Sequence, residues 1–369
     1  MEGSRFMRAA PWSGARDGRR RKGANPGASV SNHAGKDPTR RQRARQALSG
    51  LDSAFAFTEE RWMNRFALRD LTDRLDAQTQ HEDIVRILAT REFPWDVEQA
   101  LSFALFRTYA VPSIGVLLHD TDEFTQRTQK RYDDTVLILD TILEHGMASQ
   151  EGRSAFRRMN QMHGAYDISN DDMRYVLSTF VVMPVRWIAD FGWRPFTPHE
   201  VTGWTNYYRA VGRHMGIQDI PETYEAFTSL MDGYEATHFA FDARSKAVAD
   251  ATLELLTTFP PTNLAPKRLV TLFARTLMED ALLDAFHYPH PSSLSRKVFR
   301  LALKARGTFV RYALSPKKEP AYARQRANIR SYPDGYAVES LGTFPRTCPV
   351  KHGAAAEGSP QRAPSKGGP

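Results

Sequence analysis

The segment 157–194 holds the residues of this chain whose types and spacing could do chemistry. His163 ends a Met-rich helical turn and is followed directly by Gly164, and arginines and tryptophans recur on both sides of it. A neutral imidazole, apolar walls and arginines that can pair with propionates are what an axial ligand of a buried iron porphyrin requires. The same surroundings also suit a core histidine satisfied within the protein, so the residues alone leave both interpretations open.

A second group of polar residues lies upstream of His163. Arg131 and Thr135 are four residues apart and therefore share one helix face. An arginine and a hydroxyl on one face can hold a carboxylate, a propionate or a bound peroxide. The cluster 119–123 contributes His119, Asp120, Asp122 and Glu123. This cluster predicts either a general base or hard-metal site, or a loop of helix-capping acids.

A third pattern pairs a carboxylate with a histidine three residues later. It occurs at Glu235/His238 and at Asp284/His287, and this is the spacing that carboxylate-bridged di-iron bundles use. Asp284 and His287 precede a Pro-rich stretch, which disfavours a buried bundle site there. The single cysteine, Cys348, excludes an internal disulfide and any multi-cysteine zinc or iron–sulfur site.

The elements that must position these side chains read as helices. Apolar residues recur three and four apart, and strand-like alternation is scarce. Proposed helices cover 82–89, 97–107, 135–145, 171–187, 199–214, 220–239, 244–257, 264–286 and 294–311. Ser169 and Thr197 are placed to cap two of them, with Glu200 three residues after Thr197. The pattern predicts an all-α fold.

Charge and composition divide the chain into three parts. Residues 1–50 contain 12 Lys or Arg and 3 Asp or Glu, so this segment carries +9, whereas the other 319 residues carry −1. We therefore predict a disordered basic tail over 1–50, one all-α domain over 51–320, and an irregular or disordered C-terminal tail over 321–369. No stretch of 18 apolar residues and no secretion signal is present, which favours a cytoplasmic protein.

The residues around His163 resemble those of a known family. From Arg157 the chain reads Arg-x-x-Asn-x-Met-His-Gly-x-Tyr-x-Ile-Ser-Asn-x-Asp-Met-x-Tyr-x-Leu-Ser, followed by Pro184-x-Arg186-Trp187 and Trp193-Arg194. Gly212-x-x-Met215-Gly216-Ile217 and Tyr234-Glu235 extend the pattern. This run, over about residues 95–250, is similar to the MpaB-type oxygenases, which share a catalytic domain with the bacterial latex-clearing proteins (rubber oxygenases).

The resemblance implies a single globin-like helical domain that binds haem b. Rubber oxygenases use O₂ to cleave the double bonds of polyisoprene, and MpaB-type enzymes cleave a prenyl side chain. It implies that His163 is the proximal ligand, that Arg131 and Thr135 lie near the porphyrin, and that a base lies in 119–123, with Asp120 the first choice. Asp134 departs from the pattern, because rubber oxygenases have a lysine there that serves as a distal ligand.

The sequence thus predicts a haem b-dependent oxygenase that acts with O₂ on a lipophilic, alkene-containing and isoprenoid-like small molecule. Arg157 is expected to contact the cofactor, with Met159, Met162, Phe180 and Trp187 as wall residues. The alternatives are a non-haem di-iron or metal oxidase built on Glu235/His238 and Asp284/His287, and a non-catalytic helical haem-binding protein. No specific nucleic-acid partner is expected. The basic segment 294–311 fits either a membrane surface or packing on the same chain.

Overall fold

The computed structural model describes residues 65–342, and within that range the chain is all-α, as predicted, with no strand. The α-helices are α2 (Ala67–Thr72), α3 (His81–Ile87), α4 (Pro94–Tyr109), α5 (Pro112–Asp120), α6 (Glu123–Gln126), α7 (Thr128–His145), α8 (Gln150–His163), α9 (Asn170–Phe191), α10 (Pro198–His214), α11 (Tyr224–His238), α12 (Ala243–Leu256), α13 (Lys267–Leu277), α14 (Asp280–Ala285) and α15 (Ser293–Ala313). A π-turn (Leu88–Glu92) extends α3, and three short 3-10 turns follow at Thr262–Leu264, Ala323–Gln325 and Val338–Ser340. The two predicted tails, 1–50 and the part of 321–369 beyond 342, lie outside the described residues.

Local sequence signals set where several helices begin. The Ser169 hydroxyl accepts a hydrogen bond from the Asp172 amide and starts α9. Thr197 and Glu200 form the predicted capping box at the start of α10, in which each side chain accepts from the other residue's backbone amide. The predicted 220–239 helix begins later, at Tyr224, because Thr223 caps it. The predicted 264–286 helix is divided into α13 and α14 at Met278 and Glu279.

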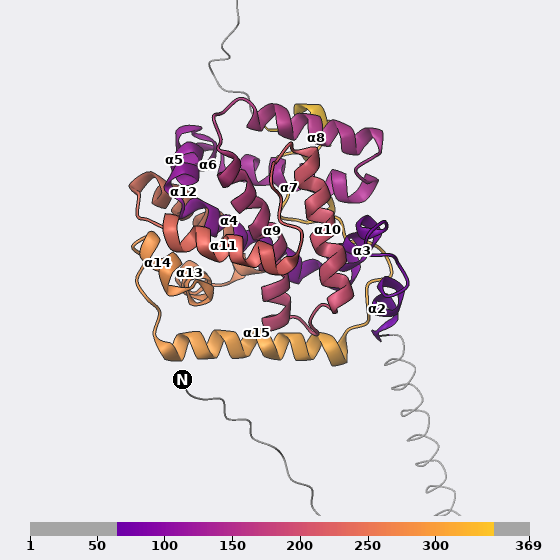
Figure 1. Ribbon diagram of the computed structural model, residues 1–369. Helices are drawn as coiled ribbons and strands as arrows, with labels where there is room; N and C mark the ends of the chain where they lie inside the picture. The colour runs from indigo at the N-terminus through magenta and orange to yellow at the C-terminus, as the bar shows by residue number, and fades with distance from the viewer. Residues whose placement is uncertain (1–64, 343–369) are drawn as a thin grey trace, which may run out of the picture. The chain divides into compact units, whose positions relative to one another are not determined.

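The helices pack around a core that α4 and α9 share. Figure 1 shows α9 and α10 running between α8 at the top of the view and α15 at the bottom. Trp204, Tyr109, Tyr175, Phe93 and Phe106 are among the largest side chains that are fully buried. Aromatic packing on this scale supplies much of the apolar area that holds a helical domain together.

Two buried arginines tie distant parts of the chain together. Arg194 pairs with Glu92 at 3.2 Å and with Glu200 at 2.7 Å, and all three side chains are buried. Arg107 forms a bidentate pair with Glu235, and the Tyr175 hydroxyl donates to the same carboxylate at 3.1 Å. Each guanidinium therefore has carboxylate partners for its charge, which is the condition under which buried ions are tolerated.

The C-terminal segment (residues 321–342) crosses α7 through carboxylates on that helix. Asp140 accepts hydrogen bonds from the Ala323 amide at 2.9 Å and from the Arg324 amide at 3.3 Å. Asp133, which is fully buried, accepts from the amides of Arg330 at 3.0 Å and Ser331 at 2.8 Å. Irregular backbone needs partners for its amides when it is buried. The acids of α7 supply them, and this segment packs on the helical domain.

No single helix in the range 65–342 is long and apolar enough to cross a bilayer. The pair formed by Pro94–Tyr109 and Pro112–Asp120 passes the length and composition criteria jointly, although the two helices are bent by 96° relative to each other.

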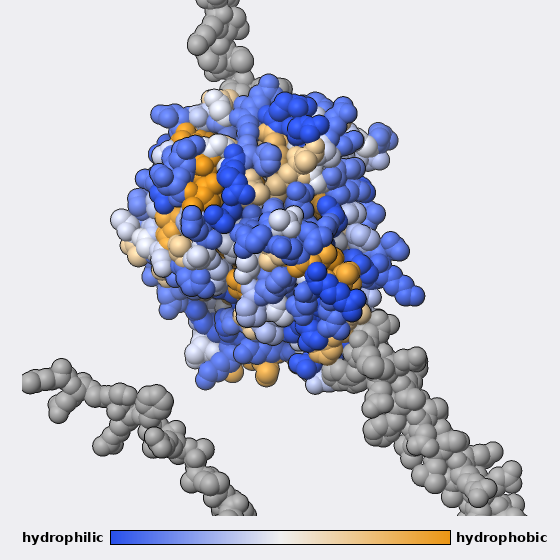
Figure 2. All heavy atoms as spheres, turned by 45° about the vertical axis from the view of Figure 1, so that its right-hand side comes forward, coloured by the Kyte–Doolittle hydropathy of each residue, from blue (hydrophilic) through white to orange (hydrophobic). Residues whose placement is uncertain are grey.

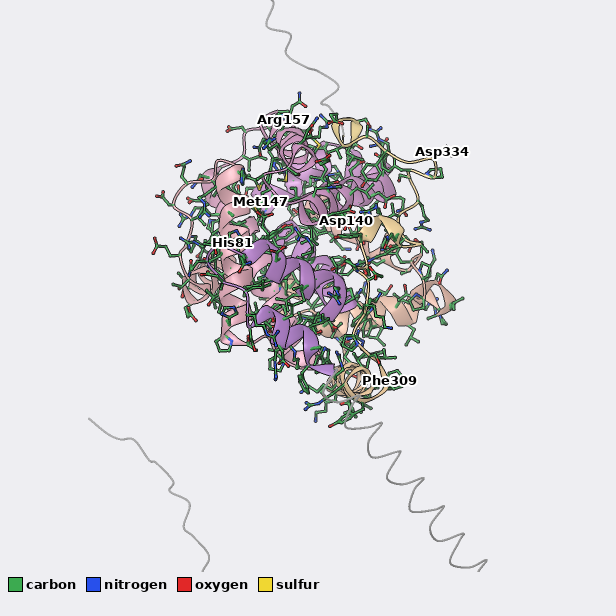
Figure 3. All side chains as sticks on the ribbon, turned by 90° about the vertical axis from the view of Figure 1, so that its right-hand side faces the viewer. His81, Asp140, Met147, Arg157, Phe309 and Asp334 are labelled. Carbon is green, nitrogen blue, oxygen red and sulfur yellow. The ribbon has the colours of Figure 1, made fainter. Side chains whose placement is uncertain are left out.

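Replacement of Asp140 tests how the C-terminal segment is held. In Asp140→Asn, one of the two backbone N–H groups, that of Ala323 or Arg324, would face the side-chain NH₂ group instead of an oxygen. We therefore expect the free energy of unfolding to fall by about 1–3 kcal/mol. Urea unfolding measures this change, and limited proteolysis should show faster cleavage within 321–342. Asp334→Asn is the matched control because Asp334 is exposed on the same segment (Figure 3). Equal stability of the two variants would contradict the role of Asp140.

Candidate active site

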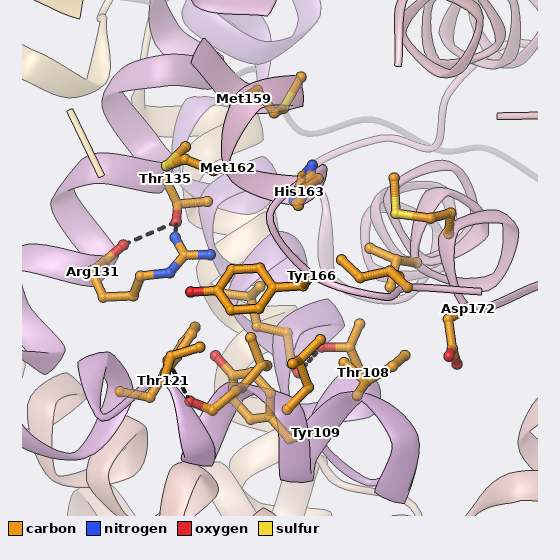
Figure 4. A pocket seen from close by; sticks show the side chains of 18 of the residues that line it. Thr108, Tyr109, Thr121, Arg131, Thr135, Met159, Met162, His163, Tyr166 and Asp172 are labelled. Carbon is orange, nitrogen blue, oxygen red and sulfur yellow. Dashed lines mark hydrogen bonds between the residues drawn. The ribbon is translucent and has the colours of Figure 1, made fainter. Parts of the chain in front are cut away.

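A cavity of about 540 Å³ opens among α4, α5, α7, α8, α9, α10 and α12. Its volume lies in the range of small-molecule and cofactor sites, roughly 300–1,000 Å³. Most of the lining side chains are apolar, and Leu, Ile, Val, Met and aromatic residues dominate. The few polar groups include those that the sequence singled out: Arg131 and Thr135 from α7 and His163 from α8 (Figure 4).

His163 is the last residue of α8 and lines this cavity. Its Nδ1 atom is buried, and the ring forms no hydrogen bond with any described residue. Desolvation and, to a smaller extent, the nearby charge of Arg131 lower the pKa of His163 to about 4. The imidazole is therefore neutral near pH 7 and keeps a lone pair, which is the form that binds metals. The interpretation of His163 as a core histidine with satisfied hydrogen bonds does not fit this geometry.

Arg131 and Thr135 come together as the four-residue spacing predicts. The Arg131 Nη1 atom donates to the Thr135 hydroxyl, which itself donates to the Arg131 carbonyl at 2.9 Å. The guanidinium lies 4.9 Å from the centre of the Phe124 ring, and Tyr166 lies beside it in Figure 4. Burial lowers the pKa of Arg131. No carboxylate among residues 65–342 forms an ion pair with this arginine, although the nearby charges of Asp134 and Glu123 partly offset the effect of burial on its pKa.

The acids of 119–123 separate into two environments. Asp120 is exposed at the end of α5, where it pairs with His119 at 3.1 Å and Arg244 at 3.5 Å, and it does not line the cavity. Glu123 does line the cavity, and its side chain is buried. One of its oxygens accepts from Arg127, while Oε2 is buried without a hydrogen-bond partner among the described residues. Glu123 is thus the cavity carboxylate of this cluster.

The remaining predicted site residues divide in the same way. Met159, Met162 and Phe180 line the cavity, whereas Trp187 lies elsewhere in the core, stacked on Phe103 at 5.5 Å. Arg157 is exposed on α8 and hydrogen-bonds Ser154 at 2.7 Å, away from the cavity-lining residues (Figure 3).

The carboxylate–histidine pairs do not assemble a metal site. Glu235 is occupied by Arg107, and the His238 ring stacks on Tyr234 at 3.9 Å. His290, rather than His287, pairs with Asp284, at 2.6 Å. Over the described range no group of three or more His, Cys, Asp or Glu side chains is arranged to hold a metal ion.

Comparison with known proteins places this geometry in a family. A family model described as "ER-bound oxygenase mpaB/B'/Rubber oxygenase, catalytic domain" matches residues 97–308, more than half of the chain. The chain belongs to this family. The resemblance predicted from the run around His163 is therefore confirmed, and the matched region contains His163, Arg131, Thr135 and Glu123.

Individual relatives carry the same description. The chain is 30% identical over 291 residues to ER-bound oxygenase mpaB' of Penicillium brevicompactum, with 73% of this chain and 66% of that protein covered. It is 30% identical over 244 residues to ER-bound oxygenase mpaB of Penicillium roqueforti (strain FM164), with 61% and 79% covered. The chain thus spans just under two thirds of the length of the first relative.

Residues beyond the region that the family model matches also form part of the cavity wall, and the sequence did not predict this. The C-terminal segment starts after residue 308, yet Gly342 lines the cavity. The Arg158 guanidinium and the Lys130 ammonium both donate to carbonyls at the end of this segment, those of Leu341 and Gly342. A Cβ atom at Gly342 would lie 1.9 Å from the Met162 sulfur, so the backbone here is packed directly against the residue that precedes His163.

A pair of glycine substitutions isolates that contact. Gly342 and Gly335 both have positive φ, +76° and +96°, so an alanine strains either backbone, but only at Gly342 would the new methyl collide with another residue. We expect Gly342→Ala to lower the free energy of unfolding by about 1–3 kcal/mol more than Gly335→Ala, the usual cost of overpacking. Urea unfolding of both variants measures the difference. Equal effects would show that Gly342 does not press on Met162.

Proposed function

We propose that this member of the MpaB/rubber oxygenase family is a haem b-dependent oxygenase that uses O₂ on a lipophilic, alkene-containing small molecule of isoprenoid type. The observation that carries the proposal is the His163 ring, which has no hydrogen-bond partner among the described residues and lines a large apolar cavity beside the Arg131 guanidinium, which forms no ion pair with a described residue. A neutral imidazole would supply the nitrogen that holds the iron, and a desolvated arginine would supply the partner for a carboxylate of the cofactor.

The residues of the cavity fit a haem in three respects. His163 offers a nitrogen donor that no described residue occupies. Arg131 is desolvated and forms no ion pair with a described carboxylate, and porphyrin propionates are carboxylates that would compensate its charge. The surrounding Leu, Ile, Met and aromatic side chains provide the apolar contact that a porphyrin face needs. Thr135 fixes the direction of the Arg131 side chain through their mutual hydrogen bonds.

The chain's own residues then have defined roles. Haem b, when bound, supplies the redox-active iron for O₂ chemistry. His163 would hold the iron, and Arg131 with Thr135 would hold a propionate. Glu123 Oε2, buried and without a partner, is the atom placed to accept a proton from the substrate. The apolar walls bind the hydrocarbon part of the substrate and exclude water from the reaction. In this proposal Glu123 takes the role for which Asp120 was the first choice in the sequence, because Asp120 lies outside the cavity lining.

The names of the relatives also bear on location. The Penicillium proteins are named ER-bound. We therefore include peripheral contact with a membrane in the proposed function, because a lipophilic substrate partitions into lipid.

The haem proposal is tested by absorption spectra after haemin reconstitution, together with a pyridine haemochrome assay. We expect a Soret band in the unmodified protein and its loss or a strong shift in His163→Ala, because the proposed function has this imidazole hold the iron. His145→Ala, which removes an exposed histidine from α7, is the control and should retain the spectrum.

Two outcomes would contradict the haem proposal. An unmodified protein that takes up no haem would remove the basis of the mechanism. A spectrum unchanged in His163→Ala would assign the iron to another ligand. A protein that binds haem and turns over no isoprenoid alkene under O₂ would be a haem-binding protein without oxygenase activity.

The role of Glu123 is tested by comparing two carboxylate substitutions. With farnesyl acetate as the probe alkene and O₂ uptake as the assay, we expect Glu123→Gln to lower kcat by about 10²–10⁴-fold, the usual contribution of a general base. Asp120→Asn should change kcat little, because that carboxylate is exposed and paired on the surface. The haem spectrum of both variants should match that of the unmodified protein. A loss of activity in Asp120→Asn alone would return the base to Asp120.

A further inference from the structure

Helix α15 (Ser293–Ala313) presents a face of exposed apolar side chains. Leu294, Leu301 and Phe309 are 70%, 68% and 59% exposed, and Val298 is 53% exposed. At 100° per residue these positions fall within one narrow sector of the helix. The stripe extends over most of the helix, whose 21 residues span about 30 Å. Apolar residues exposed singly are common, but a continuous stripe of this kind marks a binding surface.

The opposite face of α15 fixes which way the stripe points. Arg296, Arg300 and Arg306 reach across to Asp280, Asp190 and Asp96. Leu303 and Gly307 are buried against the domain. The helix is therefore held at three points along its length and cannot rotate to bury the outer residues. In Figure 1 it forms the lower edge of the domain, and Figure 3 shows Phe309 at that edge.

The charged residues that α15 itself and the residues next to it in the chain contribute are basic. Between Asp284 and Glu319 the chain has no acidic residue and eight basic ones. Three of these are the arginines that hold α15 to the domain. Lys297 and Lys304 instead flank the stripe on the exposed side, where neither forms an ion pair with a described residue. Lys317 and Lys318 follow directly after the helix.

We propose that the outer face of α15 is a docking surface for an anionic lipid bilayer. A helix that lies in a membrane interface has this distribution: an apolar stripe of Leu and aromatic residues that enters the acyl boundary and lysines beside it that meet lipid phosphates. A protein partner of complementary charge would need an acidic rim around an apolar groove. An anionic bilayer supplies the negative charge through its lipid phosphates and the apolar contact through its acyl chains. Figure 2 shows hydrophobic atoms at the lower edge of the domain, at the height of α15 in Figure 1.

The outer face of α15 would make the membrane contact that the proposed function includes, and this contact does not require haem. In the docked orientation α15 lies on the lipid, while α8 and His163 lie at the opposite side of the described domain (Figure 1). Vesicle binding and the haem spectrum can therefore fail independently of each other.

The test is co-sedimentation of the full chain with phosphatidylcholine vesicles that contain or lack phosphatidylserine. We expect binding that depends on phosphatidylserine and weakens as salt is added. The variant Lys297→Gln/Lys304→Gln should bind less tightly by about fivefold for each charge removed, roughly 25-fold for the pair. The variant Leu301→Ser/Phe309→Ser should lose binding to the vesicles that contain phosphatidylserine, while its circular dichroism and melting remain those of the unmodified chain because both side chains are exposed.

The matched control is Arg153→Gln/Arg213→Gln, which removes the same charge from exposed positions on α8 and α10 and should bind vesicles normally. A dye on Leu301→Cys in a Cys348→Ser background reports the contact directly, through a blue shift on addition of vesicles. The same dye on Arg153→Cys should show none.

Three results would overturn the proposal. If Arg153→Gln/Arg213→Gln loses as much binding as Lys297→Gln/Lys304→Gln, the binding depends on the net charge of the whole chain, including residues 1–50, and not on α15. If the emission of the dye at position 301 is already blue-shifted without vesicles, another part of this chain covers the stripe. If that shift depends on protein concentration, a second copy of the chain covers it. Retention of binding in both α15 variants would place the membrane contact elsewhere.

Discussion

The desolvated guanidinium of Arg131 is the constraint on which the arrangement of the cavity depends. An ion in an apolar enclosure is costly unless an opposite charge accompanies it. Among the described residues no carboxylate forms an ion pair with Arg131: Glu123 is directed to Arg127, and Asp134 to Lys130 and Tyr332. The charges of these two acids act on the guanidinium without direct contact, and Thr135 contributes a neutral hydroxyl. Burial, together with the charge of Arg131, lowers the pKa of His163 and keeps its imidazole neutral. The cavity thus combines a desolvated cation with a neutral nitrogen donor.

Helix α7 carries a second set of groups on its other side. Asp133, Asp134 and Asp140 are buried and turned away from the cavity, toward the C-terminal segment. Asp134, the residue at which the sequence departs from the resemblance, accepts a hydrogen bond from the Tyr332 hydroxyl of that segment. The residue beside Thr135 therefore helps to attach the C-terminal segment. One face of α7 carries side chains that line the cavity, and the other holds the segment that completes the cavity wall.

Much of the fold and part of the site could be predicted because the relevant signals are local. Capping residues and apolar spacing indicate the helices, and four-residue spacing brings Arg131 to Thr135. Arg157 and His163 are six residues apart on α8, which places them on different faces of the helix. Only His163 therefore lines the cavity, although both belong to the same sequence motif. Among the acids of 119–123, one backbone angle decides which side chain reaches the cavity. Asp120 ends α5 with its side chain in solvent, and Asp122 then adopts φ +61°. This left-handed turn directs Glu123 into the cavity. The contacts of Gly342 join positions about 180 residues apart and leave no trace in local composition.

The position of Gly342 has a consequence for how this family can diversify. Helices α5 to α12 carry the chemical groups and lie within the shared domain, whereas the wall beside Met162 is built by backbone that follows the family match. That stretch is anchored to α7 through Asp133 and Asp140 and to α8 through Arg158, so lengthening or re-routing it would also require new anchors on those helices. The shape of the cavity is therefore set jointly by the matched helices and by backbone outside the match.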